Sequence, residues 1–354
     1  MIDRTTLSGK TSKHVPGSRA FAGLDAKDVK ESDVQVAAVP APVPAPAPLV
    51  PAVTQPEAPA PQPAAAANPL VPAQPQPAAA SALDPYKGLG AWVDIYDYAI
   101  RDVMDIPAAV EEMANRDVRT LYLQTGRWKD PQDIVNPVAV GLFLDSAKKR
   151  GMKVVGWYVP GFGDMDRDVR RSVAVMHFRS PVGNRFDGFA PDIETKEEVS
   201  RNTVRFNAGV VEYSRRLREA LPNAVLGAIV LDAKNNLRAP AAWANFPWPE
   251  IGKYYDIILP MAYWSVTKAG ACQSREFDTS QYIREVATLT ENLMGMRRPF
   301  HMIGGIADCI TEGEVKGFVT GSKETGSLGA SLYDFASTQS SPVKIWHGLS
   351  SINT

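Results

Sequence analysis

Two carboxylic acids stand two residues apart at the end of an apolar stretch, FDGFAPDIE (186–194). Alternate residues of a β-strand share a face, so Ala190, Asp192 and Glu194 are expected to point the same way. Like charge and partial burial raise the pKa of one acid in such a pair, which keeps it protonated near neutral pH. We therefore predict that this pair supplies a general acid and that the other carboxylate is its electrostatic partner.

Polar and aromatic residues also follow the other apolar stretches of the chain. Side chains of these types bind the hydroxyl groups and the apolar C–H faces of sugars, or supply a second carboxylate. The candidates for substrate binding are Asp94, Arg127, Tyr158, Asp232, Lys234, Tyr263, Trp264 and Asp334, and a further candidate for catalysis is Asp308.

The elements that must position these residues alternate between two kinds. Short β-branched and aromatic stretches alternate with amphipathic segments that are long enough for crossover helices. The expected strands are 91–97, 119–126, 153–161, 186–194, 225–233, 256–264, 300–308 and 328–336. Eight such units predict an α/β fold, a single (β/α)8 TIM barrel, whose strands bring their carboxyl ends to one mouth. A doubly wound open sheet is the alternative, but it would spread the same residues along an edge.

The stretch FDGFAPDIE resembles the DGxDxDxE signature on strand four of family-18 glycoside hydrolases, the chitinase-like (β/α)8 enzymes. Met261-Ala262-Tyr263-Trp264 resembles the MxYD motif of the same family. The resemblance implies that Glu194 protonates the leaving oxygen, while Asp192 and Tyr263 hold the acetamido group that serves as internal nucleophile. Region 90–340 also resembles uncharacterised glycosidase-like barrels of actinobacteria.

Two residues depart from the family-18 pattern. Ala190 stands at the position of the middle Asp, and Trp264 stands at the position of the final Asp of MxYD. A different glycosidase mechanism would take its acid from Glu194 and its second carboxylate from Asp308 or Asp334.

Other functions and roles stay open from the residues alone. The barrel could bind carbohydrate without catalysis, or it could be a lyase or isomerase for a small acid. Asp192 and Glu194 could instead cap the following helix, because acids favour the first helical turn. Asp308 could cap a helix too, although Thr311 in TEGE is the better candidate.

The composition divides the chain into three parts. Residues 1–39 are polar without a clear period, and we expect a disordered tail. Residues 40–85 hold 15 of the 29 prolines, interleaved with alanine, which predicts an extended linker. The barrel is expected over 86–345. Such a stalk favours an extracellular or cell-envelope protein, although the start of the chain has no clear signal peptide.

Charge and motifs argue against several classes of function. With 38 basic and 39 acidic residues the chain lacks the excess of positive charge that nucleic acid binding needs. No apolar run is long enough for a transmembrane segment. The four histidines form no ligand motif, so we expect neither a metal nor a cofactor. A carbohydrate substrate and a monomer are expected. Cys272 and Cys309 are a candidate disulfide.

Overall fold

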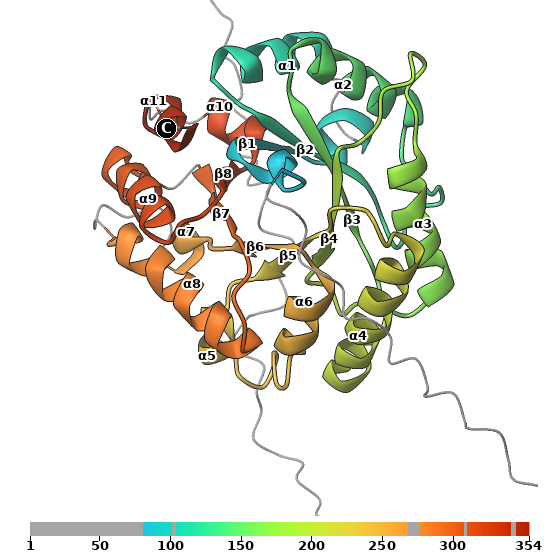
Figure 1. Ribbon diagram of the computed structural model, residues 1–354, viewed down its shortest axis with the longest axis vertical. Helices are drawn as coiled ribbons and strands as arrows, with labels where there is room; N and C mark the ends of the chain where they lie inside the picture. Colours follow the sequence, from blue (N-terminus) through green and yellow to red (C-terminus); the bar gives the residue numbers. More distant parts are fainter. Residues whose placement is uncertain (1–80, 101–103, 268–276, 308–309, 341–344, 354) are drawn as a thin grey trace, which may run out of the picture. The chain divides into compact units, whose positions relative to one another are not determined.

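The computed structural model describes residues 81–100, 104–267, 277–307, 310–340 and 345–353. These residues form a closed barrel of eight parallel strands in the order β1 to β8, with helices between them (Figure 1). The predicted (β/α)8 barrel is thus confirmed, and the alternative of an open sheet is wrong because β1 pairs with both β2 and β8.

Every predicted strand is present, with slightly shifted ends. The strands are β1 (Gly88–Val93), β2 (Thr120–Arg127), β3 (Lys153–Val159), β4 (Gly188–Ile193), β5 (Gly227–Leu231), β6 (Ile257–Met261), β7 (His301–Gly305) and β8 (Gly329–Tyr333). The first strand ends earlier than expected, because the chain turns at Asp94 into the short helix η2 (Tyr96–Ile100).

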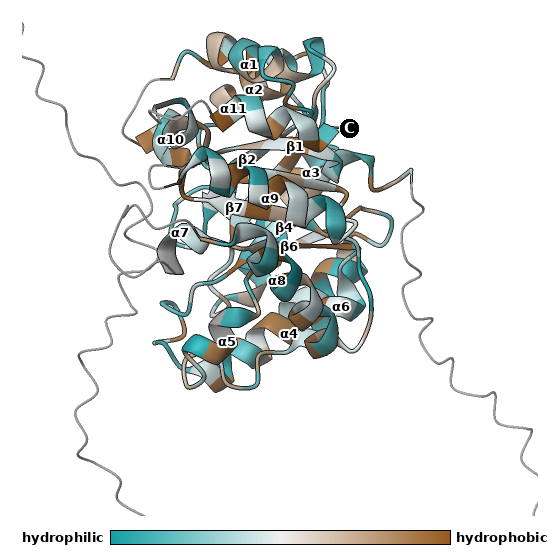
Figure 2. Ribbon diagram, turned by 90° about the vertical axis from the view of Figure 1, so that its left-hand side faces the viewer, coloured by the Kyte–Doolittle hydropathy of each residue, from teal (hydrophilic) through white to brown (hydrophobic). Residues whose placement is uncertain are grey.

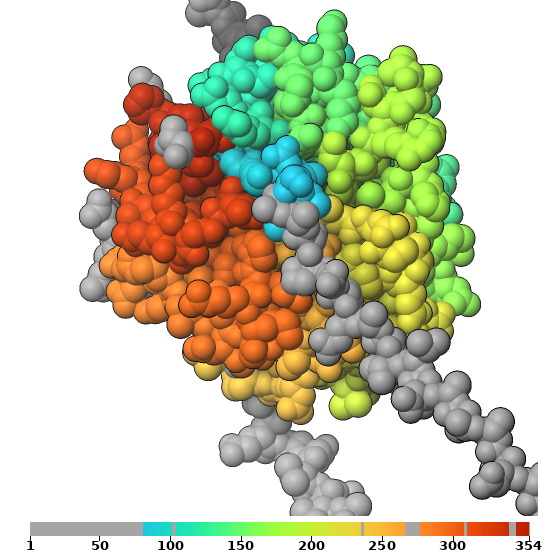
Figure 3. Space-filling view, in the orientation of Figure 1, coloured from blue at the N-terminus to red at the C-terminus, as the bar shows by residue number. Residues whose placement is uncertain are grey.

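The helices that follow the strands form the outer layer. They are α1 (Ile106–Asn115), α2 (Pro137–Lys149), α3 (Met165–His177), α4 (Thr203–Ala220), α5 (Lys234–Arg238), α6 (Trp248–Tyr254), α7 (Trp264–Thr267), α8 (Thr279–Met294), α9 (Glu312–Glu324), α10 (Phe335–Ser340) and α11 (Ile345–Leu349). Short 3-10 helices precede β1 at Asp84–Tyr86 and follow α11 at Ser350–Asn353. Figure 3 shows that consecutive units follow one another round the molecule.

Local signals in the sequence account for the ends and faces of these helices. Asp278 caps α8 by accepting a hydrogen bond from the backbone of Gln281, and Gly295 ends that helix in the left-handed conformation. Thr311 and Glu314 form the capping box of α9, as the TEGE pattern predicts. Helices such as α4 and α8 carry both hydrophilic and hydrophobic residues, as expected for helices with one face against the barrel (Figure 2).

The barrel interior is filled by layers of side chains. At the amino ends of the strands the Tyr86 hydroxyl donates to the Phe189 carbonyl (3.0 Å), and small residues such as Gly188 make room for its ring. Above it, the buried ring of His301 contacts the hydroxyl groups of Tyr122 (3.0 Å) and Ser331 (2.9 Å). The interior is therefore a packed core that supports the residues at the carboxyl ends of the strands.

Among the described residues, none of the helices combines the length and the apolar character that crossing a membrane requires.

Candidate active site

Strand β4 carries its two acids to the mouth of the barrel. Gly188, whose missing Cβ would meet Tyr86, faces inward, and the alternation of the strand places Asp192 on the same face. Asp192 is buried and Glu194, just past the strand, is half-buried. Neither acid caps the following helix, because the N-cap of α4 is Asn202.

Burial and like charge shift the pKa values of both acids upward. Burial, followed by the charge of Glu194, raises the pKa of Asp192 well above its ordinary value. Burial, followed by the charge of Glu197, raises the pKa of Glu194 to about 7. Among the residues that the structure describes, no hydrogen bond or ion pair reaches the Glu194 carboxyl group. A carboxyl group in this state is half protonated near neutral pH and can give its proton to a ligand.

Tyr263 comes to the same place from the loop after β6. The tyrosine is buried, and desolvation raises the pKa of its hydroxyl. The negative charges of Asp192, Glu194 and Asp334 raise this pKa further, so these three carboxyl groups act on the Tyr263 hydroxyl through their charge. The structure thus brings the predicted acid, its partner and the predicted donor together.

Strands β1 and β8 supply a second group of acids. The Tyr333 hydroxyl donates to Asp94 Oδ2 (3.1 Å), and Tyr333 packs against Tyr263 with ring centroids 6.0 Å apart. Asp334 Oδ1 accepts from the backbone of Ser337 (2.8 Å) and so caps α10. Asp94 and Asp334 therefore lie at the mouth, as predicted, with structural partners of their own.

The carboxylates of Asp94, Asp97 and Asp334 lie within 4.8 Å of one another. In the part of the chain that the structure describes, they are the group whose spacing would allow a metal ion to bind. Asp94 also contacts Tyr333, and Asp334 also contacts the backbone of Ser337, so both acids have partners within the protein.

Arg127 lies at the end of β2, close to this acidic group. Its guanidinium pairs with Asp130 (2.7 Å), donates to the Tyr96 hydroxyl and lies 5.0 Å from the centre of that ring. Two partners therefore hold Arg127 at the rim, where the field of Asp94 also acts on it.

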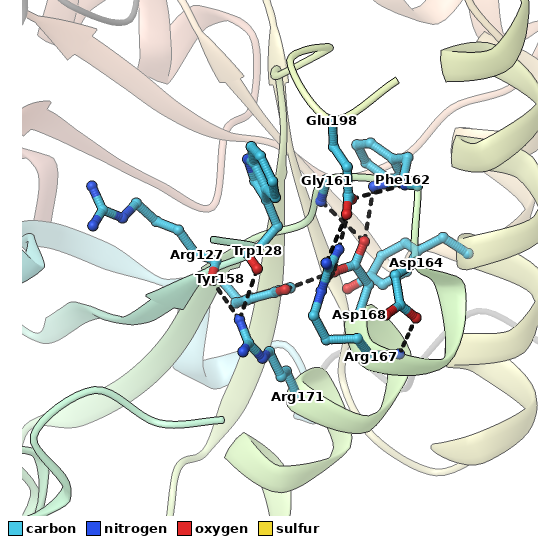
Figure 4. Close-up of polar contacts among 12 residues, drawn as sticks. Arg127, Trp128, Tyr158, Gly161, Phe162, Asp164, Arg167, Asp168, Arg171 and Glu198 are labelled. Carbon is cyan, nitrogen blue, oxygen red and sulfur yellow. Dashed lines mark hydrogen bonds and ion pairs between the residues drawn. The ribbon is translucent and has the colours of Figure 1, made fainter. Parts of the chain in front are cut away.

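Tyr158 points away from the mouth, toward α3. Its hydroxyl donates to the buried carboxylate of Asp168 (2.7 Å), which also accepts from the backbone of Gly161 and Phe162 and pairs with Arg167 (Figure 4). The same arginine pairs with Glu198 (2.6 Å) and so ties the loop after β4 to α3. Tyr158 is therefore part of a structural network, and the structure does not bring it to the other predicted binding residues.

Asp232 and Lys234 are held by α8. Asp232 is buried and accepts from the Tyr282 hydroxyl (2.7 Å) and from Arg238 (3.3 Å), while Lys234 pairs with Glu285. Both contacts face the helical layer, so the structure does not group these two residues with Glu194.

Trp264 is fully buried on the outside of the barrel wall. Its ring packs against Phe318 of α9 (5.2 Å between centroids), and a Cβ on Gly304 would collide with it. Asp187, which opens the strand-four motif, accepts from the backbone of Val154 (2.7 Å) at the other end of β4. Asp308, Cys272 and Cys309 lie outside the described residues.

Trp157 is an interior residue that the sequence did not single out. It pairs in register with the inward-facing Ala190, and its ring meets Trp92 edge-on at 5.8 Å. Its neighbour Gly156 faces outward, since a Cβ there would meet Val175 of α3. The pairing of Trp157 with Ala190 shows which face of β3 points into the barrel. The sequence KVVGWYV could not show this, because it is apolar on both faces of the strand.

No protein-family model matches the chain, and no curated protein sequence matches it either. Solved structures do resemble it. The exo-β-1,4-mannosidase of Opitutaceae bacterium strain TAV5 has a TM-score of 0.54 and 12% identity over 70% of this chain, which spans only 52% of that protein's length.

Two further neighbours cover this chain to a similar extent. The endo-1,4-β-mannanase of Rhizomucor miehei has a TM-score of 0.56 and 8% identity over 75% of this chain and 94% of its own. The family GH18 chitinase of Cycas revoluta has a TM-score of 0.51 and 15% identity over 75% of this chain and 98% of its own. This chain therefore has the barrel fold that these glycoside hydrolases share.

Proposed function

We propose that this protein is a glycoside hydrolase that cleaves a glycosidic bond in a polysaccharide or cell-wall glycan. The observation that carries the proposal is the Glu194 carboxyl group. It is half-buried at the mouth of the barrel, lies beside Asp192 and Tyr263, and has its pKa raised to about 7. The mannosidase, mannanase and chitinase among the structural neighbours support a carbohydrate substrate.

In the proposed mechanism Glu194 protonates the oxygen of the leaving sugar. Its raised pKa keeps a large share of the carboxyl groups protonated near neutral pH, as a general acid requires. Asp192 and the Tyr263 hydroxyl then position a substituent of the sugar ring through hydrogen bonds.

We propose two alternatives for the group that attacks the anomeric carbon of the sugar. If the substrate carries an acetamido group, that group can attack while Asp192 and Tyr263 hold it, as the resemblance to family 18 implies. If it does not, a second carboxylate must act, and the candidates are Asp308 and Asp334. Asp334 acts on Tyr263 through its charge and therefore lies at the same mouth.

The test is the Glu194→Gln variant, assayed on a panel of mannan, chitin, xylan and cell-wall glycans. Gln keeps the size of the side chain but cannot donate an acidic proton, so we expect kcat to fall at least about a hundredfold. Wild-type kcat/KM should decline above about pH 7, where Glu194 loses its proton, and the variant should lose this decline. Unchanged turnover in Glu194→Gln would exclude Glu194 as the acid.

The matched control is Glu197→Gln, which changes an exposed acid three residues away. We expect it to keep its turnover. The charge of Glu197 is one cause of the raised pKa of Glu194, so its removal should move the alkaline decline to lower pH.

A second candidate function is a carbohydrate-binding barrel without catalysis. Ala190 favours it, because the carboxyl group that would share a proton with Asp192 in the family-18 pattern is missing. Binding of a glycan by the wild type without any turnover would support this function over the first.

We further propose that the barrel works outside the cell or in the cell envelope. The proline- and alanine-rich segment 40–85 has the composition of a spacer between a domain and a surface. Polymeric glycans in such a location would be accessible to the mouth of the barrel. Fractionation of cells that produce the full chain would test this location.

A further inference from the structure

Two polar atoms in the upper part of the barrel interior lack a hydrogen-bond partner among the described residues. They are Nε1 of Trp157 and Oδ1 of Asp192. Trp157 is only 4% exposed and Asp192 only 7%. Buried polar groups are nearly always paired, because burying them without a partner is costly. Two such atoms on adjacent strands of one barrel therefore need an explanation.

The pairing of the strands places the two side chains in neighbouring positions. Trp157 of β3 lies opposite Ala190 of β4, and Asp192 is the next inward-facing residue of β4 toward the mouth. Adjacent strands lie about 4.8 Å apart and rise about 3.3 Å per residue, so residues two positions out of register lie about 8 Å apart, which an aromatic side chain can span. Ala190, the residue in register with Trp157, has a small side chain.

The indole ring is held in its position by the layer beneath it. Trp157 meets the ring of Trp92 edge-on at an interplanar angle of 67°. Trp92 in turn stacks on Tyr122 at 4.2 Å and donates to Ser331 Oγ (2.7 Å). Trp92 thus satisfies its own N–H group within the protein, whereas the N–H group of Trp157 has no such partner in the described part of the chain.

We propose that Trp157 is a specificity-determining residue that donates its indole N–H to the substituent on the sugar carbon next to the scissile bond. Asp192 accepts from the same substituent, so the site selects a neutral group with both a donor and an acceptor, either a hydroxyl or an acetamido group. This inference rests on the proposed glycosidase function, which places the sugar next to Glu194 and therefore next to Asp192.

The test compares Trp157→Phe with the wild type on three pairs of p-nitrophenyl disaccharides. The pairs are the mannobioside, the chitobioside and the xylobioside, each with its counterpart that lacks the substituent at carbon 2 of the reacting sugar. Phe retains an aromatic ring beside Trp92 but removes the donor. We expect KM to rise about tenfold or more on the intact probe, with kcat within about threefold, because a binding contact is lost.

The counterparts without the substituent distinguish recognition from packing. For the wild type, kcat/KM on each counterpart should be about tenfold or more below kcat/KM on the intact probe. For Trp157→Phe this loss should be less than about threefold. A merely structural role of Trp157 would leave this loss unchanged. The mannobioside and xylobioside pairs report on a hydroxyl group, and the chitobioside pair reports on an acetamido group.

The matched control is Trp248→Phe. Trp248 of α6 is also 4% exposed and its Nε1 also lacks a partner among the described residues, but it packs on Phe246 in the helical layer. The Trp248→Phe variant should have the same KM as the wild type and the same loss of kcat/KM on the counterparts.

The inference would be overturned if the wild type and Trp157→Phe had equal KM values and lost equally in kcat/KM on the counterparts. The glycosidase function would then stay in place. Failure of the wild type to bind or cleave any of the three intact probes would also overturn it. In that case the wider glycan panel decides whether the proposed function fails as well.

Discussion

Asp192 and Glu194 show how two acids at the end of one strand come to differ in burial and in pKa. Asp192 is buried, while Glu194 stands past the end of the strand and has its pKa raised only to about 7. The raised pKa values mean that the fold tolerates groups that would be more stable in water. Such a cost is typical of residues that act on a ligand.

Replacing Asp192 with Asn should therefore stabilise the protein. Asn keeps the shape but carries no charge, so we expect the free energy of unfolding to rise by about 1–2 kcal/mol at pH 8. Turnover of the glycan should fall about tenfold or more in the same variant. Urea unfolding followed by fluorescence gives the first quantity and steady-state kinetics gives the second. A loss of stability would indicate that the Asp192 carboxylate has a structural role.

The strands and helices explain which parts of the site the sequence could predict. All eight strands and the barrel follow from the alternation of apolar and amphipathic stretches, and the inward alternation of Asp192 follows from the small residues before it. The face of Tyr158 could not be predicted in this way. Its strand is apolar on both sides, so only the pairing of β3 with β4 and the contact with α3 determine the face.

Residues beyond the strand ends were harder to place for a different reason. Asp232 contacts Tyr282, which is 50 positions away, and Trp264 packs against Phe318 of another helix. No local pattern encodes such partners. Tyr263 was easier because a motif and a short distance from β6 both pointed to the mouth.

The outward direction of Tyr158 leads to a prediction about the β3 and α3 units. In Tyr158→Phe the buried Asp168 loses one donor, so we expect the free energy of unfolding to fall by about 1.5–3 kcal/mol. The KM for the glycan should not change. Tyr263→Phe is the comparison, since it should change the kinetics of turnover. An altered KM in Tyr158→Phe would contradict the structural role of this tyrosine.

The barrel as a whole contains buried groups with opposite responses to pH. Burial lowers the pKa of His301 from 6.5 to about 4, so between these values only the unfolded chain takes up this proton and stability falls as pH falls. Glu194 behaves in the opposite way. Its folded pKa of about 7 lies above the ordinary 4.5, so stability falls as pH rises through that window.

In the wild type between pH 5 and pH 6.5 we therefore expect Glu194, together with Asp192, whose pKa burial also raises, to oppose the effect of His301. Glu194→Gln removes one of the two carboxyl groups that oppose His301, so toward low pH its stability should fall relative to that of the wild type, by up to about 3 kcal/mol between pH 7 and pH 4.5. Urea unfolding at several pH values measures both curves. Glu212→Gln on the surface of α4 is the control and should keep the wild-type slope above pH 5. Parallel curves for the wild type and Glu194→Gln would contradict the expectation.

The closure of the barrel has a consequence for the order of events during synthesis. The backbone of β1 pairs with β8, and the N–H of Leu89 donates to the side chain of Asn353, 264 positions later. The ribosome releases β1 long before it has made either partner. One edge of β1 therefore stays unpaired while all the following units are translated. A chaperone that covers such an edge would protect the nascent chain during that time.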